Sequence, residues 1–549
     1  MQIGSINQLT PHWLNGSRSP EVGAEAVHKA VLRLNAPFFL LDVDGQMGVA
    51  YDGAMSFDAD LPAKKKAFPV LAYVPATHPK NLGDALFKKR HGLTYAYIIG
   101  AMANGITSVE MVRAVGEAGM LGMFGAAGLS VAQVEDSVLK LRDLLEDRPF
   151  GSNLIHSPGD PEHEMAVVRL YLKHRVRLVS ASAYLSLTLP LVYYRVKGIF
   201  RDQDGNVICP NKVIGKVSRI EVARRFMSPP PEKLLIQLVD KKMITREEAS
   251  LAAYVPMADD ITAEADSGGH TDNQPAIALL PTMLALRDEM MLKYNYPTPI
   301  CVGLAGGIAT PASAAAAFAM GAGYVLTGSV NQSCVEAGTS EKVRCMLAES
   351  CQADVTMAPA ADMFEMGIKV QVLKRGTMFA FRAAKLYELY SKYDCIEDIP
   401  RKQRDMLERD YFKCGIGQVW EQTRIFFQKC DPAQILLAEK DPKHKMALLF
   451  RSYLGQSSNW ASSGEPDRII DYQIWCGPSM GAFNEWVRGS FLEKPENRKT
   501  VTIAMNLMFG ASLATRVNWL RCQGAAIPSG MEHFSPLTVD EISALLTEY

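Results

Sequence analysis

From about residue 95 to residue 330, short apolar runs alternate with segments whose apolar positions have helical spacing. The segment that begins at Ser130 illustrates the helical part, because this hydroxyl cap is followed three residues later by Gln133. Its apolar positions recur on one helix face at Val131, Val134, Val138, Leu141 and Leu145. The apolar runs predict eight strands, at Tyr97–Ala101, Met120–Phe124, Phe150–Ile155, Arg177–Ala183, Val213–Val217, Asp260–Ala265, Ile300–Leu304 and Tyr324–Gly328.

A repeated order of strand and then helix predicts a parallel sheet with right-handed crossovers. Eight such units that close on themselves form a (β/α)₈ TIM barrel, an α/β fold that we place at residues 91–340. An open, doubly wound sheet is the competing architecture. Its dinucleotide-binding version is disfavoured, because no G-x-G-x-x-G follows the first strand.

The two flanks of the predicted barrel have different patterns. Residues 1–90 contain two apolar runs, Phe38–Val43 and Met47–Tyr51, separated by the turn signal Asp44-Gly45, so we expect an N-terminal β-rich element. Residues 341–549 lose the alternation and are rich in Met, Leu, Ala, Lys and Glu at helical spacing. They predict a mostly helical C-terminal substrate or lid domain.

Composition narrows the class of protein. The 58 Lys and Arg residues nearly balance the 59 Asp and Glu residues, which argues against nucleic acid as a partner. The ten cysteines form no C-x-x-C pair and have no histidine at metal-ligand spacing, so we expect free thiols and no metal site. No signal peptide is evident, and the most apolar window, Val179–Tyr194, is interrupted by polar residues and proline. We expect a cytoplasmic protein that does not span a membrane.

Two neighbouring strand ends have the composition of a phosphate site. Gly306 and Gly307 follow the seventh strand and precede Thr310-Pro311, a hydroxyl cap with proline at the first helical position. Gly328 and Ser329 follow the eighth strand. Backbone N–H groups at such glycines approach an anion closely, and the loops after strands 7 and 8 of TIM barrels often bind phosphate. The alternative is that these glycines only permit tight turns.

Other strand ends carry residues suited to a flat heteroaromatic ring. After the first strand, Ala101, Met102 and Ala103 offer small side chains and one soft thioether. Asn153, at the third strand, presents an amide, and Lys216, at the fifth, presents a cation suited to a reduced flavin. Each signal is weak alone, but with a phosphate site opposite them they outline a site for flavin mononucleotide (FMN).

One histidine is a candidate for acid–base chemistry. Gly268 and Gly269 follow the sixth strand and allow a ring to lie against the backbone, and His270 comes next. A histidine at this mouth can donate a proton or hydrogen-bond a developing enolate. The alternative is a histidine that only orients the loop.

These motifs resemble a known superfamily. Gly100–Gly105, Gly151–Leu154, Ser267–His270, Gly306-Gly307 and Gly328-Ser329 are similar to the flavin-binding motifs of nitronate monooxygenases and flavin-dependent enoyl reductases, over about residues 92–335. Including Ala358–Phe364 and Trp475–Gly481, nearly the whole chain resembles the trans-acting (PfaD-type) enoyl reductases that serve polyunsaturated-fatty-acid and trans-acyltransferase polyketide synthases.

The resemblance implies that FMN passes a hydride from NADPH to a 2-enoyl thioester on an acyl carrier protein, with His270 as the first choice of proton donor. Homo-oligomers are common among flavin barrels, so the resemblance is also compatible with a homo-oligomer. Short basic runs are candidates for docking the acidic carrier: Lys64–Lys66, Lys88–Arg90, Arg224-Arg225 and Lys241-Lys242. Two alternatives remain open, a nitronate monooxygenase that needs no carrier and a non-catalytic scaffold that keeps flavin for stability.

Overall fold

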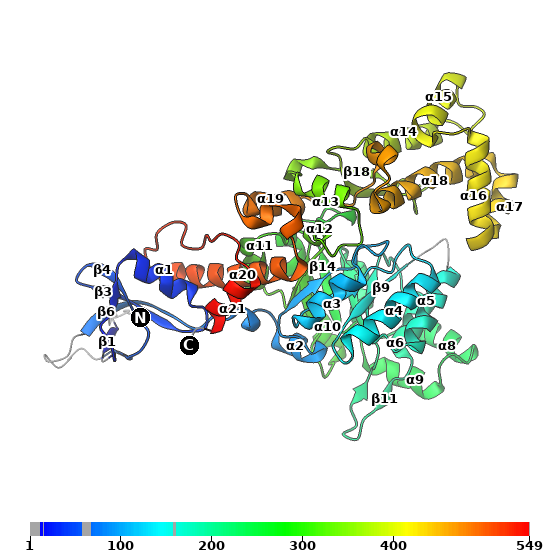
Figure 1. Cartoon of the computed structure of the whole chain (residues 1–549). Coiled ribbons are helices and arrows are strands. Elements are labelled where there is room, and N and C mark those ends of the chain that lie inside the picture. The colour runs from blue at the N-terminus through cyan, green and yellow to red at the C-terminus, as the bar shows by residue number, and fades with distance from the viewer. Residues whose placement is uncertain (1–10, 15, 58–66, 157–160, 548–549) are drawn as a thin grey trace, which may run out of the picture. The chain divides into compact units, whose positions relative to one another are not determined.

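We analysed a computed structural model, which describes residues 11–14, 16–57, 67–156 and 161–547 (Figure 1). Its internal contacts divide the chain into two units, and each is described by itself. The first unit contains the residues up to 85, residues 310–319 and those from 501 onward. The second, which we call the barrel unit, contains residues 86–309 and 320–500. Within the described ranges, no helix combines the length and the apolar character needed to cross a bilayer.

Eight parallel strands close into a barrel in the barrel unit. They are β7 (Tyr97–Ile99), β8 (Leu121–Phe124), β9 (Gly151–Ile155), β10 (Leu178–Ser182), β13 (Lys212–Val217), β14 (Asp260–Glu264), β16 (Cys301–Ala305) and β17 (Val325–Thr327). The last strand pairs with the first, Thr327 opposite Ile99, which closes the ring. Every predicted strand is present, so the TIM-barrel prediction is confirmed.

Helices follow the strands and cover the barrel, as α3, α4, α5 and α10 do around β9 and β14 in Figure 1. The main ones are α3 (Val109–Glu117), α4 (Val131–Leu145), α5 (Pro161–Lys173), α6 (Leu189–Val196), α7 (Ile220–Met227), α8 (Glu232–Asp240), α9 (Arg246–Leu251), α10 (Ala276–Tyr294), α12 (Ser329–Gln332) and α13 (Glu341–Ala348). Ser130 and Gln133 form the predicted capping box of α4. Val134, Val138, Leu141 and Leu145 of that helix are buried.

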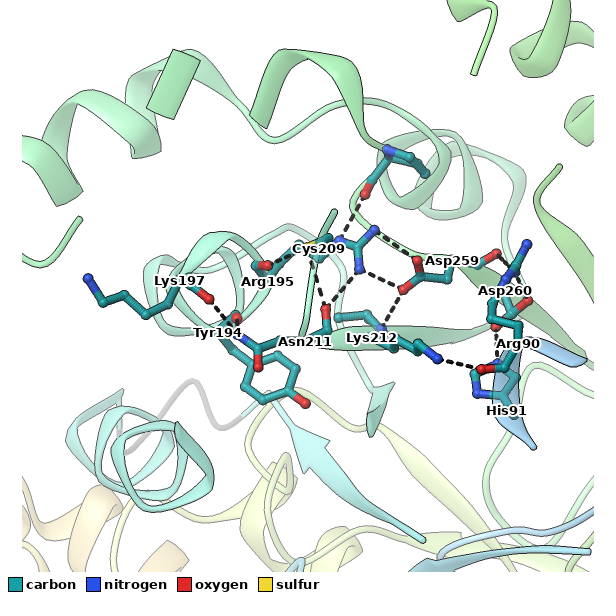
Figure 2. A network of polar contacts seen from close by, with 12 residues as sticks. Arg90, His91, Tyr194, Arg195, Lys197, Cys209, Asn211, Lys212, Asp259 and Asp260 are labelled. Carbon is teal, nitrogen blue, oxygen red and sulfur yellow. Dashed lines mark hydrogen bonds and ion pairs between the residues drawn. The ribbon is translucent and has the colours of Figure 1, made fainter. Parts of the chain in front are cut away.

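Helix α2 (Ala85–His91) supplies charged partners to the amino end of β14 (Figure 2). Asp260, the first residue of β14, is fully buried. Its carboxylate lies 2.5 Å from Arg90 Nη1 and 2.7 Å from His91 Nε2. Because a buried carboxylate needs partners, these two contacts hold the end of α2 against the barrel.

A second ion pair lies beside the first, at the same end of the barrel. Arg195 of α6 is buried, and its Nη1 lies 2.6 Å from Asp259 Oδ2. Burial raises the pKa of Asp259, but the Arg195 guanidinium, the Val213 N–H and Arg90 together lower it more, so that it lies below its ordinary value. Lys212 Nζ donates to the Arg90 backbone carbonyl. In Figure 2 these side chains form one connected polar network.

The rest of the barrel unit is mostly helical, as predicted for this part of the chain. Its helices are α14 (Phe379–Lys392), α15 (Arg401–Met406), α16 (Ile416–Cys430), α17 (Pro432–Lys440), α18 (Pro442–Ser463) and α19 (Ser479–Val487). It also holds β18 (Val355–Pro359) and β19 (Lys369–Leu373), which the sequence pattern did not predict. These two strands form a sheet with β15 (Gly269–His270), a pairing partner that only the tertiary fold provides.

The first unit contains the predicted β-rich element. Its sheet has the order β2-β4-β3-β6-β1-β5. The strands are β1 (His12–Leu14), β2 (Glu21–Val22), β3 (Phe38–Val43), β4 (Gln46–Ala50), β5 (Ala54–Ser56) and β6 (Ala67–Val74). Asp44 and Gly45 form the β3–β4 turn with positive φ angles of 53° and 84°.

Four of the described helices belong mainly to this first unit: α1 (Ala24–Leu32), α11 (Pro311–Ala319), α20 (Thr500–Cys522) and α21 (Val539–Thr547). Its core joins Val27, Val31 and Phe38 to Leu513 and Val517 of α20. The contacts therefore group residues after 500 with the N-terminal sheet. The predicted domain boundaries at residues 90 and 340 remain predictions.

We expect Asp260→Ala to destabilise the protein by about 3–5 kcal/mol, because it leaves Arg90 and His91 without their buried carboxylate. Urea-induced unfolding followed by circular dichroism measures this change. Glu117→Ala is the matched control, since its ion pair with Arg113 is half-exposed and contributes less than about 1 kcal/mol. Equal losses in the two variants would contradict the assigned role of the buried pair.

Candidate functional site

The predicted site residues all lie at the carboxyl ends of strands in one closed barrel. Ala101, Met102 and Ala103 follow β7, Asn153 lies in β9, Lys216 lies in β13, Gly268, Gly269 and His270 follow β14, Gly306 and Gly307 follow β16, and Gly328 and Ser329 follow β17. Because all eight strands are parallel, these ends share one mouth of the barrel. The roles assigned to the residues remain proposals.

The residues predicted for the phosphate site, Gly306, Gly307, Gly328 and Ser329, are called the cradle below. Two of its glycines have open space in front of the backbone. A Cβ atom added at Gly307 or Gly328 would meet no atom within 4 Å. Gly306 differs, because its Cβ would lie 2.6 Å from the carbonyl carbon of Ala265, so it also serves close packing between β14 and β16. Ser329 Oγ accepts a hydrogen bond of 3.0 Å from Gly477 N. Gly307 and Gly328 therefore have open space in front of the backbone, whereas Gly306 does not.

The loop after β7 is fixed by residues that the sequence did not single out for the site. Thr107 Oγ1 accepts from Met102 N at 2.9 Å and donates to Gly100 O at 2.8 Å. A Cβ atom at Gly125 would lie 1.8 Å from the Met102 carbonyl oxygen, so only glycine fits there. Thr107 and Gly125 thus hold the backbone around Met102 in place.

Asn153 is partly committed to holding a neighbouring loop. Its Oδ1 accepts hydrogen bonds from Ala126 N at 2.7 Å and Ala127 N at 3.2 Å. Its amide nitrogen makes no hydrogen bond to any residue that the structure describes. The oxygen of the Asn153 amide therefore holds the neighbouring loop, and its nitrogen has no partner among the described residues.

Lys216 does not carry an isolated positive charge. Its Nζ lies 2.6 Å from Oε1 of Glu264, the last residue of β14. Ser267 Oγ donates to the same oxygen at 3.2 Å. The sequence analysis missed Glu264, although its place at the end of a barrel strand was a usable signal.

His270 is paired with a carboxylate from outside the barrel. Its Nε2 lies 3.2 Å from Asp362 Oδ1, and the two side chains are 37% and 53% exposed. Burial lowers the pKa of His270, but Asp362 raises it more, so that it lies above its ordinary value. Burial raises the pKa of Asp362, but His270, with smaller contributions from a backbone N–H and Arg451, lowers it to below its ordinary value. The imidazolium form of His270 is therefore favoured by its surroundings.

The outer wall of the mouth comes from residues 371 and 475–477. A Cβ atom at Gly268 would lie 2.9 Å from Cys476 N, so this glycine is required by the close approach of two backbones. A Cβ atom added at Gly269 would lie 3.9 Å from the Trp475 ring, an ordinary van der Waals contact, but the positive φ of 80° favours glycine there. Gln371 donates to Asp266 Oδ1 at 2.8 Å and to Ser267 O at 2.9 Å.

The closed parallel barrel, with a glycine-rich and polar mouth, defines a TIM barrel of the kind that binds its ligand at the carboxyl ends of the strands. Residues 87–398 match the nitronate monooxygenase family, which is more than half of the chain. Residues 393–472 match the inserted helical domain of acyl-carrier-protein S-malonyltransferase.

The chain is also similar to individual proteins. The crystal structure of the enoyl reductase domain of MlnA, from the macrolactin cluster of Bacillus amyloliquefaciens, is 41% identical with a TM-score of 0.75, covering 81% of this chain and 99% of that domain. Polyketide biosynthesis protein PksE of Bacillus subtilis is 49% identical, covering 78% of this chain and 56% of that protein. A polyunsaturated fatty acid synthase polypeptide of a Thraustochytrium species is 45% identical, covering 80% of this chain and 30% of that polypeptide.

The chain therefore belongs to the nitronate monooxygenase family and, within it, to the trans-acting enoyl reductase group that its motifs resemble. It spans about a third to just over half the length of these two curated relatives.

We expect Asp362→Asn to lower the pKa of His270, because the carboxylate that raises it is removed while burial continues to lower it. Carbethoxylation of His270 by diethylpyrocarbonate, followed by peptide mass spectrometry across pH, measures this pKa. In the wild-type protein, the His270–Asp362 pair stabilises the folded state at pH values below the ordinary histidine pKa. This contribution to folding stability is lost as the pH rises through the raised pKa of His270. Asp394→Asn is the control, because Asp394 pairs with Lys443 on the surface. An unchanged His270 profile in Asp362→Asn would refute the pairing.

Proposed function

We propose that this chain is a trans-acting enoyl reductase with bound FMN, and that NADPH is its electron donor. The substrates would be 2-enoyl thioesters on acyl carrier protein domains in polyketide or polyunsaturated fatty acid biosynthesis. The observation that carries the proposal is the 41% identity to the macrolactin enoyl reductase domain over 99% of that domain. The relatives named for polyketide and polyunsaturated fatty acid synthesis support the same pathway class.

The mouth of the barrel fits FMN. The open space at Gly307 and Gly328 suits a phosphate group, with backbone N–H groups as donors. The fixed backbone around Met102 and the unbonded amide nitrogen of Asn153 suit a planar ring with polar edges. When bound, FMN would accept a hydride from NADPH and deliver it to the β-carbon of the enoyl thioester.

A residue of this chain would donate the proton to the substrate. The His270 side chain is partly exposed, its Nε2 is buried beside Asp362, and Asp362 favours the imidazolium form, so an imidazolium N–H is suited to protonate the substrate α-carbon. The overall balance is one enoyl thioester, one NADPH and one proton giving one saturated acyl thioester and one NADP⁺. The Lys216–Glu264 pair keeps the same mouth polar without leaving a lone charge there.

The basic runs differ in how free they are to dock a carrier protein. Arg90 is engaged with Asp260, and Arg224 lies 2.5 Å from Glu289. Lys241 and Lys242, at the end of α8, form no ion pair with any residue that the structure describes and are exposed, which supports them as docking candidates. Lys64–Lys66 lie outside the described residues.

We expect Gly328→Leu to lower the flavin content of the purified protein at least about tenfold, because the side chain would occupy the space proposed for the phosphate. Gly328 has a φ of −129°, so the substitution does not force a left-handed backbone. Absorbance of the released flavin measures its content. Gly417→Leu is the matched control, since that glycine also has open space in front of it. Full flavin content in Gly328→Leu would rule out the cradle.

We expect His270→Gln to retain its flavin and its reduction by NADPH, but to slow reoxidation by a crotonyl thioester on a carrier or pantetheine by about 10²–10⁴-fold. The loss follows from removal of the proton donor. Anaerobic stopped-flow absorbance measures the two half-reactions separately. Unchanged reoxidation would remove His270 from the mechanism.

The same measurement on the wild-type protein distinguishes the alternatives. Bleaching by NADPH followed by recovery with the enoyl thioester would establish the reductase. Recovery only with oxygen and a nitronate would favour a nitronate monooxygenase. Bound flavin that NADPH does not reduce would favour a non-catalytic scaffold.

A further inference from the structure

Gln371 of β19 connects three segments around the mouth of the barrel. It is only 5% exposed. Besides its bonds to Asp266 Oδ1 and Ser267 O, its Oε1 accepts from Asn273 Nδ2 at 3.3 Å. Its backbone pairs with Gly269 and accepts from Cys476 N at 3.3 Å. Asp266 to Asn273 span the loop that carries His270, and its two ends also bond each other directly, Asn273 Nδ2 to Asp266 Oδ1 at 2.8 Å, so the buried Gln371 side chain joins both ends of that loop to β19.

A primary amide is the side chain that fits these three partners. Asp266 and the Ser267 carbonyl are acceptors, so they need a donor with two N–H groups. The Asn273 amide nitrogen donates to Asp266 Oδ1 at 2.8 Å and also to the acceptor oxygen of the same Gln371 side chain at 3.3 Å. A carboxylate at position 371 would have no N–H to offer and would face the Asp266 carboxylate. A buried hydrophobic side chain would leave the Ser267 carbonyl unpaired and would remove one of the two hydrogen bonds of Asp266 Oδ1 and of Asn273 Nδ2, which would still bond each other at 2.8 Å.

We propose that Gln371 is a positioning residue: from a strand outside the barrel it fixes the Ser267–His270 backbone, so that the His270 imidazole meets Asp362 and faces the substrate. The effect of Gln371 on enoyl thioester reduction rests on the proposed function. Its effect on His270 is a property of the protein alone.

The electrostatic surroundings of His270 make its position measurable. The charged groups that act on it are Asp362, Lys216 and Glu264. Lys216 and Glu264 extend from barrel strands β13 and β14, whereas Asp362 lies in the segment between β18 and β19. The strand pair β15–β19, with His270 opposite Val370, ties the loop to that segment. Loosening of the loop would therefore change the His270–Asp362 distance before it changed the barrel.

The test is Gln371→Met, which keeps the length of the side chain and removes its hydrogen bonds. Diethylpyrocarbonate reactivity of His270 across pH is measured in the full-length protein, in wild-type and Asp362→Asn backgrounds. We expect Gln371→Met to lower the His270 pKa in the wild-type background and to cause no further shift in Asp362→Asn, because the two residues act through one contact. Enoyl thioester reduction should fall roughly tenfold to a hundredfold with flavin content retained.

Asn484→Leu is the matched control. Asn484 Nδ2 likewise bridges two carbonyl oxygens, at 2.8 Å and 2.7 Å, but these belong to Leu347 and Ser350, away from the loop. It should lower stability without shifting the His270 pKa. Gln371→Asn, which keeps the amide but shortens its reach, replaces Gln371→Met if the latter does not fold, and the same pKa decrease is expected.

The outcomes separate the two proposals. An equal His270 shift in both backgrounds, or none in either, would overturn the positioning role of Gln371. A wild-type protein that does not reduce enoyl thioesters would refute the proposed function, while the reactivity profiles would still decide the role of Gln371.

Discussion

The hydrogen bonds between β17 and β7 close the parallel barrel, and the site depends on that closure. They place Gly100, at the end of the first strand, against the last strand: its N–H donates to Thr327 O at 2.9 Å. A Cβ atom at Gly100 would lie 2.5 Å from Leu326 Cδ2, so the contact requires glycine. In an open sheet these two strand ends would lie at opposite edges. Closure therefore brings the residues after β7 beside the glycine cradle after β17.

Charged side chains at the two ends of the barrel have different surroundings. At the amino end, Asp259 and Asp260 are matched by Arg195 and Arg90, mostly away from water, so that loss of either partner would leave a buried charge uncompensated. At the carboxyl end, His270 and Asp362 remain partly exposed, and the pKa of the histidine lies above its ordinary value. The active sites of TIM barrels lie at the carboxyl ends of the strands. In this protein the partly exposed His270–Asp362 pair lies at that end, and the buried ion pairs lie at the other.

Residues outside the barrel form part of the wall of its mouth. Strand β19 and residues 475–477, which follow the barrel in sequence by more than 30 residues, supply the outer wall of the loop that carries His270. The contact is close enough that Gly268 and Gly477 cannot carry side chains without moving their neighbours. The glycines of the Ser267–His270 motif thus have two uses: Gly269 adopts a positive φ of 80°, and Gly268 admits the backbone of Cys476.

The sequence by itself determined the barrel, because strand and helix periodicities and caps such as Ser130 are local properties. It also located the candidate residues, since a strand's carboxyl end can be read from where its apolar run stops. It did not find Glu264, Asp362 or Gln371, whose partners are distant in sequence and chosen by packing. Nor did it reveal that residues after 500 pack on the N-terminal sheet. Only the tertiary structure decided these pairings, because periodicity records which face of an element is buried but not what covers it.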